Sequence, residues 1–378
     1  MRKILAILPS IPYYGKERSN VEVYNFIRES TNDIVEVVVS NRASVQLLDA
    51  LFNFKKYSIY TADRSKGLFG ILKYLCGYII SNIQLCFIMF RVRPDILFMC
   101  EETNFYDLFP ALLTFRKTIL YRMGDDPVFM RNRFKKYNTF VWKKFVIKRV
   151  SKVVCISQYI KSKLKESGRD VTFDVVIYNY PPTRGKSEDK CVYQVKKGLT
   201  FGYLGQIIPP KGVHHFVESA LSILEKHPDI SFYIAGSINR RPDYYKELIS
   251  MIPSERKMSI TFLDEINDLE VFFNHVDVLC VPSIKQEALG NIIVEAKKHR
   301  TPCIIYPSGG MPELITHKTD GFICKDQTPV ALTEGMLYYI DNAHLILSHS
   351  ESSYLSIEKL QIGRKYYEKK WTDVLNSI

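Results

Sequence analysis

Residues 282–315 read PSIKQEALGNIIVEAKKHRTPCIIYPSGGMPELI. The segment starts where an apolar run typical of a strand, DVLCVP at Asp277–Pro282, ends, and it enters a helix near Ala288–Gly290. A second apolar run, PCIIY at Pro302–Tyr306, follows this helix and predicts the next strand. Strand, helix and strand in this order are typical of parallel strands joined by crossover helices.

The same alternation recurs along the chain in two series of short apolar, β-branched runs. The first series comprises Lys3–Leu8, Ile34–Val39, Asp95–Cys100, Thr118–Tyr121 and Val153–Ile156. The second comprises Leu199–Leu204, Ser231–Gly236, Ser259–Leu263, Asp277–Pro282 and Pro302–Tyr306. We therefore predict an α/β protein of two Rossmann-like, doubly wound domains that face a ligand-binding cleft.

The break between the two series, Tyr178–Gly198, is rich in Pro, Gly and charged residues. A length of 378 residues also fits two domains. We predict an N-terminal, acceptor-side domain at 1–180, a linker at 181–198 and a C-terminal domain at 199–353. A final helix at 354–378 follows, and its return onto the first domain is left open.

Charge and cysteine usage narrow the class of protein. Lys and Arg number 52 against 40 Asp and Glu, a formal net charge of +12, which leaves nucleic acid, an anionic membrane and a phosphorylated substrate as partners. The eight cysteines include no pair at two-residue spacing, and most lie in apolar runs. This usage indicates buried, reduced thiols in a cytoplasmic protein, and neither a disulfide framework nor a zinc site.

The start of the helix after residue 282 has the features of an anion site. The backbone N–H groups of Ala288, Leu289, Gly290 and Asn291 would point into the cleft, and Gly290 lets a diphosphate approach the backbone. Glu287 precedes the helix and Glu295 lies two turns further on, on much the same helical face. Ionised carboxylates accept hydrogen bonds from hydroxyl groups, although a loop or cap role for Glu287 and a solvated position for Glu295 are equally ordinary.

A second loop adds a cation. The segment FGYLGQIIPPKGVHHFVESALSIL, Phe201–Leu224, predicts a strand, a loop with Gly205 and Lys211, and a helix that opens at Val213. Lys211 lies on a loop at the carboxyl end of a strand, where an ammonium group can neutralise phosphate oxygens.

With these two segments in view, the sequence resembles glycosyltransferase family 4, retaining enzymes of the GT-B fold, here of the bacterial surface-polysaccharide type. The resemblance runs over nearly the whole chain. Its most specific part is a paired-glutamate signature followed by a TP, strand, GGxPE element, which here is Glu287, Glu295, Thr301-Pro302, Gly309-Gly310 and Pro312-Glu313.

The resemblance implies a nucleotide diphosphate sugar as donor. By the family pattern, Glu287 binds hydroxyls of the donor sugar and Glu295 binds the ribose hydroxyls, while Lys211 and the amides from Ala288 to Asn291 bind the diphosphate. The loop of Gly205 departs from the pattern, because most relatives carry Arg where this chain has Gln206. A neutral amide cannot replace that charge, so either Lys211 serves alone or another basic residue contributes, with Arg240 and Arg241 the nearest by position.

The N-terminal domain matches the family less closely. Gly15 is the one glycine in PSIPYYGKERSN, the segment that directly follows the first strand, and it fits either an acceptor-side loop or a tight turn. Arg122, Asp125 and Asp126 follow the strand TILY. We assign Asp125 a catalytic role and Arg122 and Asp126 acceptor-side roles, with a helix cap as the alternative for either aspartate. The resemblance favours a reaction without a metal ion or other cofactor.

Two further segments concern membranes. Residues 131–149 carry eight basic and no acidic residues among aromatic ones, which favours peripheral contact with an anionic membrane over a solvated helix or nucleic acid. Residues 68–90 are 23 residues with one charge, Lys73. The polar or small stripe of Lys73, Gly77, Ser81 and Gln84 favours a helix packed in the first domain, with an interfacial helix and a transmembrane span as alternatives.

These observations predict a cytoplasmic enzyme, peripheral on the inner face of the plasma membrane, that transfers a sugar with retention to a glycan or lipid-linked acceptor during cell-surface polysaccharide synthesis. Two other functions stay open. A sugar-nucleotide epimerase of the same fold would need a histidine in the cleft, and the first 213 residues contain none. A non-catalytic sugar-nucleotide-binding relative would explain Gln206.

Overall fold

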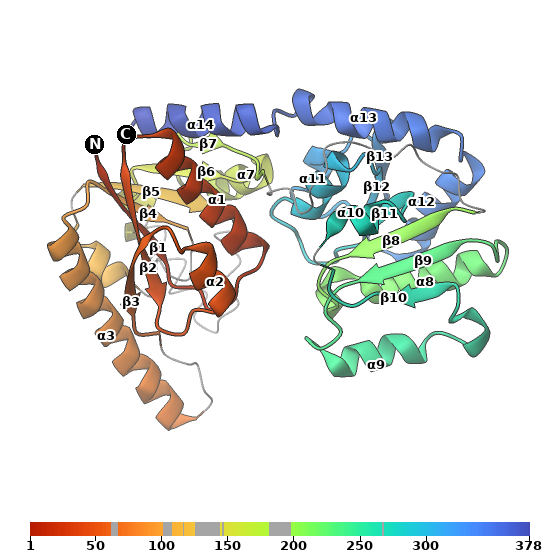
Figure 1. Ribbon diagram of the computed structural model, residues 1–378, viewed down its shortest axis with the longest axis horizontal. Coiled ribbons are helices and arrows are strands. Elements are labelled where there is room, and N and C mark those ends of the chain that lie inside the picture. The colour runs from red at the N-terminus through yellow and green to blue at the C-terminus, as the bar shows by residue number, and fades with distance from the viewer. Residues whose placement is uncertain are drawn as a thin grey trace. The chain divides into compact units, whose positions relative to one another are not determined.

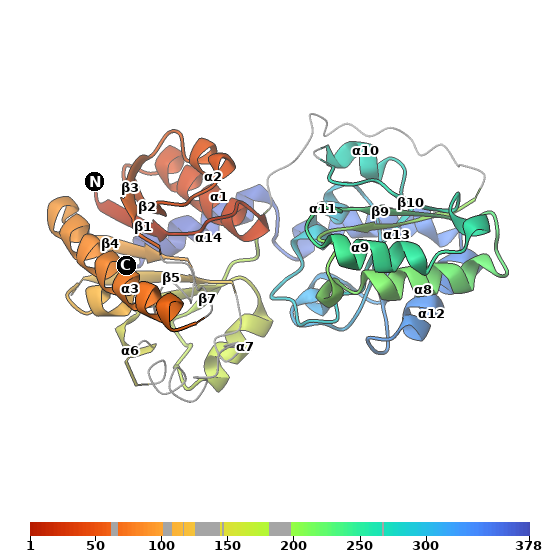
Figure 2. The same ribbon diagram turned by 90° about the horizontal axis from the view of Figure 1, so that it is seen from below.

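The computed structural model describes residues 1–61, 67–100, 108–115, 117–124, 144–145, 147–180, 198–266 and 268–378. The chain forms two compact units, drawn in Figures 1 and 2. The first unit is Met1–Pro181 together with Tyr367–Ile378, and the second is Pro182–Tyr366.

The first unit is built on a parallel sheet, which in the described part of the chain has the strand order β3-β2-β1-β4-β5-β6-β7. The strands are β1 (Lys3–Leu8), β2 (Ile34–Ser40), β3 (Lys55–Ile59), β4 (Ile96–Met99), β5 (Thr118–Met123), β6 (Lys152–Cys155) and β7 (Val175–Val176). Ala6 of β1 pairs with Val37 on one side and with Phe98 on the other. The order reverses between β1 and β4, and such a switch point is where doubly wound sheets bind ligands.

Helices cover both faces of this sheet. The described helices are α1 (Gly15–Ser30), α2 (Val45–Ala50), α3 (Leu68–Val92), α6 (Ile147–Arg149), α7 (Gln158–Glu166) and α14 (Arg364–Asn376). Helices α1, α2 and α14 lie on one face and α3 on the other (Figure 2). The N-terminal half of α3 extends past the strands (Figure 1).

The last helix, α14, completes the core of the first unit. The Trp371 ring is fully buried. It lies 5.7 Å from Phe98 of β4 and 6.2 Å from Tyr367, measured between ring centroids. The sequence predicts one final helix from residue 354, whereas the structure has two. Helix α13 (Leu345–Lys359) lies in the second unit, and α14 belongs to the first unit from Tyr367 on.

The second unit has a parallel sheet of order β10-β9-β8-β11-β12-β13. Its strands are β8 (Thr200–Leu204), β9 (Ser231–Ala235), β10 (Ile260–Phe262), β11 (Val278–Val281), β12 (Cys303–Ile305) and β13 (Gly321–Ile323). Its other helices are η2 (Pro209–Lys211), α8 (Val213–Leu224), α9 (Pro242–Ser250), η3 (Ser254–Arg256), α10 (Leu269–Phe273), α11 (Asn291–Lys298), η4 (Met311–Leu314) and α12 (Pro329–Asp341). The prediction of an α/β protein with two doubly wound sheets is confirmed.

Candidate functional site

The candidate donor site lies at the carboxyl ends of β8 and β11 in the second unit. These strands are neighbours although β9 and β10 separate them in sequence, so the sheet has its switch point between them. The loop after β8 carries Gly205, Gln206 and Lys211, and the loop after β11 carries Glu287. The topology therefore places the two predicted donor loops side by side.

Backbone hydrogen bonds join the two loops. The N–H groups of Ile284 and Lys285 both donate to the carbonyl of Pro210, at 3.0 and 3.1 Å. Gly212 follows with a φ of 71°, and a Cβ there would lie 1.9 Å from the carbonyl oxygen of Pro282. Only glycine allows this approach, so the position of Lys211 beside the second loop is fixed by the backbone.

Lys211 and Glu287 meet in an ion pair. The ammonium Nζ lies 2.6 Å from Oε1 of the carboxylate, and the two side chains are 31% and 20% exposed. The pair brings a cation suited to phosphate and an acceptor suited to sugar hydroxyls to one partly open point. The distance was not foreseeable from the sequence, because the two residues are 76 positions apart.

Tyr203, a residue that the sequence did not single out, contacts the loop that carries Gln206 and Lys211. The tyrosine is buried, and its hydroxyl donates to the carbonyl of Gln206 at 2.7 Å. Burial and the nearby charge of Glu287 raise the pKa of Tyr203 well above its ordinary value. The phenol therefore stays neutral and fixes the loop through a hydrogen bond.

Helix α11 begins later than predicted. It starts at Asn291, because Gly290 has a φ of 94° and so cannot be part of a right-handed helix. Glu287 therefore lies in a loop, and the expectation that Glu287 and Glu295 share one helical face is wrong. Glu295 lies on α11 and is 8% exposed, so it is not a solvated residue.

The loop before α11 offers backbone donors. In the described part of the chain, the N–H groups of Ala288, Leu289 and Gly290 donate no hydrogen bond. These amides precede a helix N-terminus, where an anion is favoured by both hydrogen bonding and the helix dipole. Together with Lys211, they are the candidate binding surface for a diphosphate.

The two glycines of the GGxPE element hold Glu287 in place. Gly310 N donates to the carbonyl of Glu287 at 2.8 Å, and Ser308 Oγ donates to the carbonyl of Lys285 at 2.8 Å. Gly309 has a φ of 56°, and a Cβ there would lie 1.9 Å from the Glu287 carbonyl oxygen. Proximity to this backbone explains the glycine, a role that the motif alone did not reveal.

The candidates outside this site are placed as follows. Gly15 is the first residue of α1, and Arg122, at the end of β5, is 3% exposed and donates to the side-chain oxygens of Asn20 and Asn179. Asp125 and Asp126 lie outside the described residues, as does most of the basic block 131–149. Arg240 and Arg241 are exposed after β9.

Among the residues that the structure describes, no three His, Cys, Asp or Glu side chains lie close enough together to hold a metal ion. This search does not include Asp125 and Asp126, so the metal-free reaction stays a prediction.

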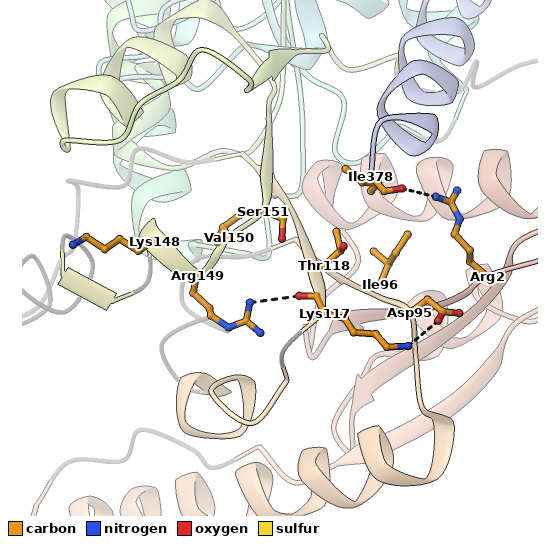
Figure 3. Close-up of a pocket in the computed structure, with 10 residues that line it drawn as sticks. All are labelled: Arg2, Asp95, Ile96, Lys117, Thr118, Lys148, Arg149, Val150, Ser151 and Ile378. Atoms are coloured by element: carbon orange, nitrogen blue, oxygen red, sulfur yellow. Dashed lines mark hydrogen bonds and ion pairs between the residues drawn. The ribbon is translucent and has the colours of Figure 1, made fainter.

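A hollow of about 570 Å³ lies in the first unit, at the edge of the sheet where the strands begin. Its lining comes from the amino ends of strands, and in Figure 3 Lys117 points toward Asp95 and Arg149 toward the Lys117 carbonyl, at 2.9 and 3.4 Å. Parallel sheets bind ligands at the carboxyl ends of their strands. The hollow is therefore not the candidate acceptor site.

Comparison with known proteins finds similarity to glycosyltransferases. Residues 187–353 match the family Glycosyl transferases group 1. An uncharacterized glycosyltransferase of Haemophilus influenzae is 22% identical over 362 residues, which are 96% of each chain. The capsular polysaccharide biosynthesis glycosyltransferase CapM of Staphylococcus aureus is 20% identical over 246 residues, 62% of this chain and 64% of CapM.

A solved structure shares the fold over the whole chain. The crystal structure of Anabaena Alr3699/HepE in complex with UDP-glucose has a TM-score of 0.77 to this chain at 17% identity, with 100% of both chains covered. The family match thus covers residues 187–353, the curated relatives are named glycosyltransferases, and the chain as a whole has the GT-B fold.

Proposed function

We propose that the protein transfers a sugar from a nucleotide diphosphate sugar to a glycan or lipid-linked glycan, with retention of configuration, in cell-surface polysaccharide synthesis. The observation that carries this proposal is the Lys211–Glu287 pair beside the amides of Ala288, Leu289 and Gly290. HepE, which shares the fold, was crystallised with UDP-glucose, and CapM acts in capsular polysaccharide biosynthesis. Both support a donor of this class and an acceptor of this kind.

In the proposed reaction, the bond between the anomeric carbon and the donor's phosphate oxygen breaks, and negative charge develops on the diphosphate. Lys211 and the three amides stabilise that charge, which is a larger effect in the transition state than in the bound donor. Glu287 exchanges its contact with Lys211 for hydroxyls of the sugar. The acceptor's hydroxyl oxygen bonds to the anomeric carbon, and the proton of that hydroxyl passes to the departing phosphate.

The proposed function also includes roles for donor- and acceptor-side residues and a location in the cell. Glu295 binds the ribose of the donor, Asp125 has a catalytic role, and Gly15, Arg122 and Asp126 lie on the acceptor side. No metal ion takes part. The enzyme works at the cytoplasmic face of the plasma membrane, in peripheral contact with it, and nucleic acid is not a partner.

Incubation with a panel of UDP- and GDP-sugars tests the function. We expect slow nucleotide release with one donor, undiminished by EDTA and accelerated by a lipid-linked glycan acceptor. NMR of the product then gives the configuration of the new linkage, which matches that of the donor under retention. Tight donor binding with no turnover under any acceptor would instead support a non-catalytic protein, and interconversion of free sugar nucleotides would support an epimerase.

A further inference from the structure

Polar side chains of α3 face the rest of the first unit. Ser81 and Asn82 are buried. Asn82 Oδ1 accepts a hydrogen bond from the backbone N–H of Ala111 at 3.0 Å, and Gln84 Oε1 accepts one from that of Tyr60 at 2.7 Å. Of the predicted small and polar stripe, Gly77, Ser81 and Gln84 therefore face the protein, whereas Lys73 is exposed.

The opposite face of α3 is apolar and exposed along its whole length. The stripe consists of Phe69, Leu72, Cys76, Ile79, Ile83, Phe87 and Phe90, whose spacing of three and four residues places them on one helical face. The exposed fraction of its six large side chains runs from 53% at Leu72 to 81% at Phe69. At a rise of 1.5 Å per residue, the stripe is roughly 32 Å long. A solvent-facing helix of a globular protein has the reverse arrangement, and a continuous apolar patch of this kind marks a surface that binds something.

Basic side chains border this apolar stripe. Lys73 and Arg91 are separated by 18 positions, which is five turns of helix, so both lie on the same flank. Arg93 follows, with its guanidinium carbon 5.8 Å from the centre of the Phe90 ring. From Gly67 to Pro94 the sequence has no acidic residue. Long basic side chains beside an apolar face can reach lipid phosphates while the hydrocarbon side chains enter the acyl region.

We propose that the apolar stripe of α3 docks into the surface of an anionic phospholipid bilayer, with the helix axis in the membrane plane. The hydrogen bonds of Asn82 and Gln84 hold α3 on the first unit, and a transmembrane position would break them. A second copy of the chain fits less well, since a contact between two α3 helices would add the charges of Lys73 and Arg91 with no acidic residue on either helix to pair with them. The inference does not depend on the donor chemistry.

Sedimentation of the full chain with vesicles tests the proposal. We expect binding to vesicles of phosphatidylcholine mixed with phosphatidylglycerol, and weaker binding to phosphatidylcholine alone. Combining Ile79→Ser, Ile83→Ser and Phe87→Ser should weaken binding at least about tenfold, because three apolar side chains no longer enter the lipid. The matched control replaces three equally exposed apolar residues of the second unit by Ser: Val330, Leu347 and Leu355, which are 65%, 75% and 58% exposed.

A second variant tests the contribution of the basic residues Lys73 and Arg91. Lys73→Gln with Arg91→Gln should lower the preference for phosphatidylglycerol and leave the apolar contribution in place. Unchanged sedimentation of the triple serine variant overturns the proposal. So does a result in which only neutralising Lys135, Lys136, Lys143 and Lys144 abolishes binding, because the basic block would then be the contact.

Cys76 provides a direct reporter, since it is exposed on the stripe. An environment-sensitive fluorophore on Cys76, in a chain carrying Cys86→Ser and Cys191→Ser, should become shielded from iodide when vesicles are added. Shielding that appears without vesicles, together with dimerisation in analytical ultracentrifugation that the triple variant abolishes, would assign the stripe to a second copy and overturn the proposal. UDP binding, measured by calorimetry on the same variants, is expected to be unchanged, and its absence in the wild type would count against the transferase proposal alone.

Discussion

At the scale of single residues, the pairing of Lys211 with Glu287 is the feature from which the proposed chemistry follows. The two charges neutralise each other. In the proposed reaction, a bound donor offers each a better partner, a phosphate oxygen for the ammonium and sugar hydroxyls for the carboxylate. Both residues therefore exchange one polar contact for another as the donor binds, and neither charge is left uncompensated in the bound state.

Lys211→Met should lower kcat/KM for the donor by about two to three orders of magnitude, because one charge that stabilises the leaving diphosphate is removed. Initial rates of nucleotide release measure this change. Lys325→Met is the matched control, since Lys325 also pairs with a glutamate, Glu334 at 2.7 Å, on the surface of the same unit. Equal rates for the Lys211 variant and the wild type would remove Lys211 from the reaction.

The sequence identifies most of the donor loops but not their geometry. Glu287 and Lys211 were predictable from their positions after apolar strands. The start of α11 at Asn291 was not, because the left-handed conformation of Gly290 becomes evident only in the fold, where Met311 and Ile293 lie 3.0 and 3.1 Å from where a Cβ would be. The role of Tyr203 was not predictable, because a tyrosine within a strand is common and its hydrogen bond to the Gln206 carbonyl is visible only in the fold.

At the scale of elements, the loop that carries Glu287 is held by the segment after β12. This dependence makes Gly309 a sensitive position although the residue has no side chain to bind a ligand. The loop and the segment are joined by the bond from Gly310 to the Glu287 carbonyl and by the bond from Ser308 to the Lys285 carbonyl.

Gly309→Ala should lower kcat/KM tenfold or more, because its Cβ would displace the backbone of Glu287 by contact. Gly168→Ala separates this effect from backbone strain, since Gly168 also has a positive φ, 97°, but no atom within 4 Å of the new Cβ. The left-handed conformation should cost each variant about 1–2 kcal/mol of stability, and Gly309→Ala should lose more because of the backbone contact, as thermal unfolding would measure. Full activity in Gly309→Ala would contradict the role given to this element.

At the scale of the whole molecule, the alternation of apolar runs was sufficient to predict two doubly wound sheets, because strand and helix periodicities are local properties. The path of the last residues was not predictable in the same way. Gln361, with a φ of 53°, lies between α13 and α14. Only tertiary packing shows that Tyr367 and Trp371 belong to the core of the first unit, nearly two hundred residues after the rest of that unit in the sequence.

Trp371→Ala should therefore destabilise the first unit and not the second. Loss of a fully buried tryptophan costs about 3–5 kcal/mol, and the cavity would lie between α14 and β4, where Trp371 packs on Phe98. Hydrogen exchange followed by mass spectrometry should show lost protection in β1, β2 and β4, with β8 and β11 unchanged. Leu355→Ala on α13 is the control, because Leu355 is 58% exposed in the second unit. Equal loss of protection in both sheets would mean that the C-terminal segment stabilises the chain as one cooperative unit.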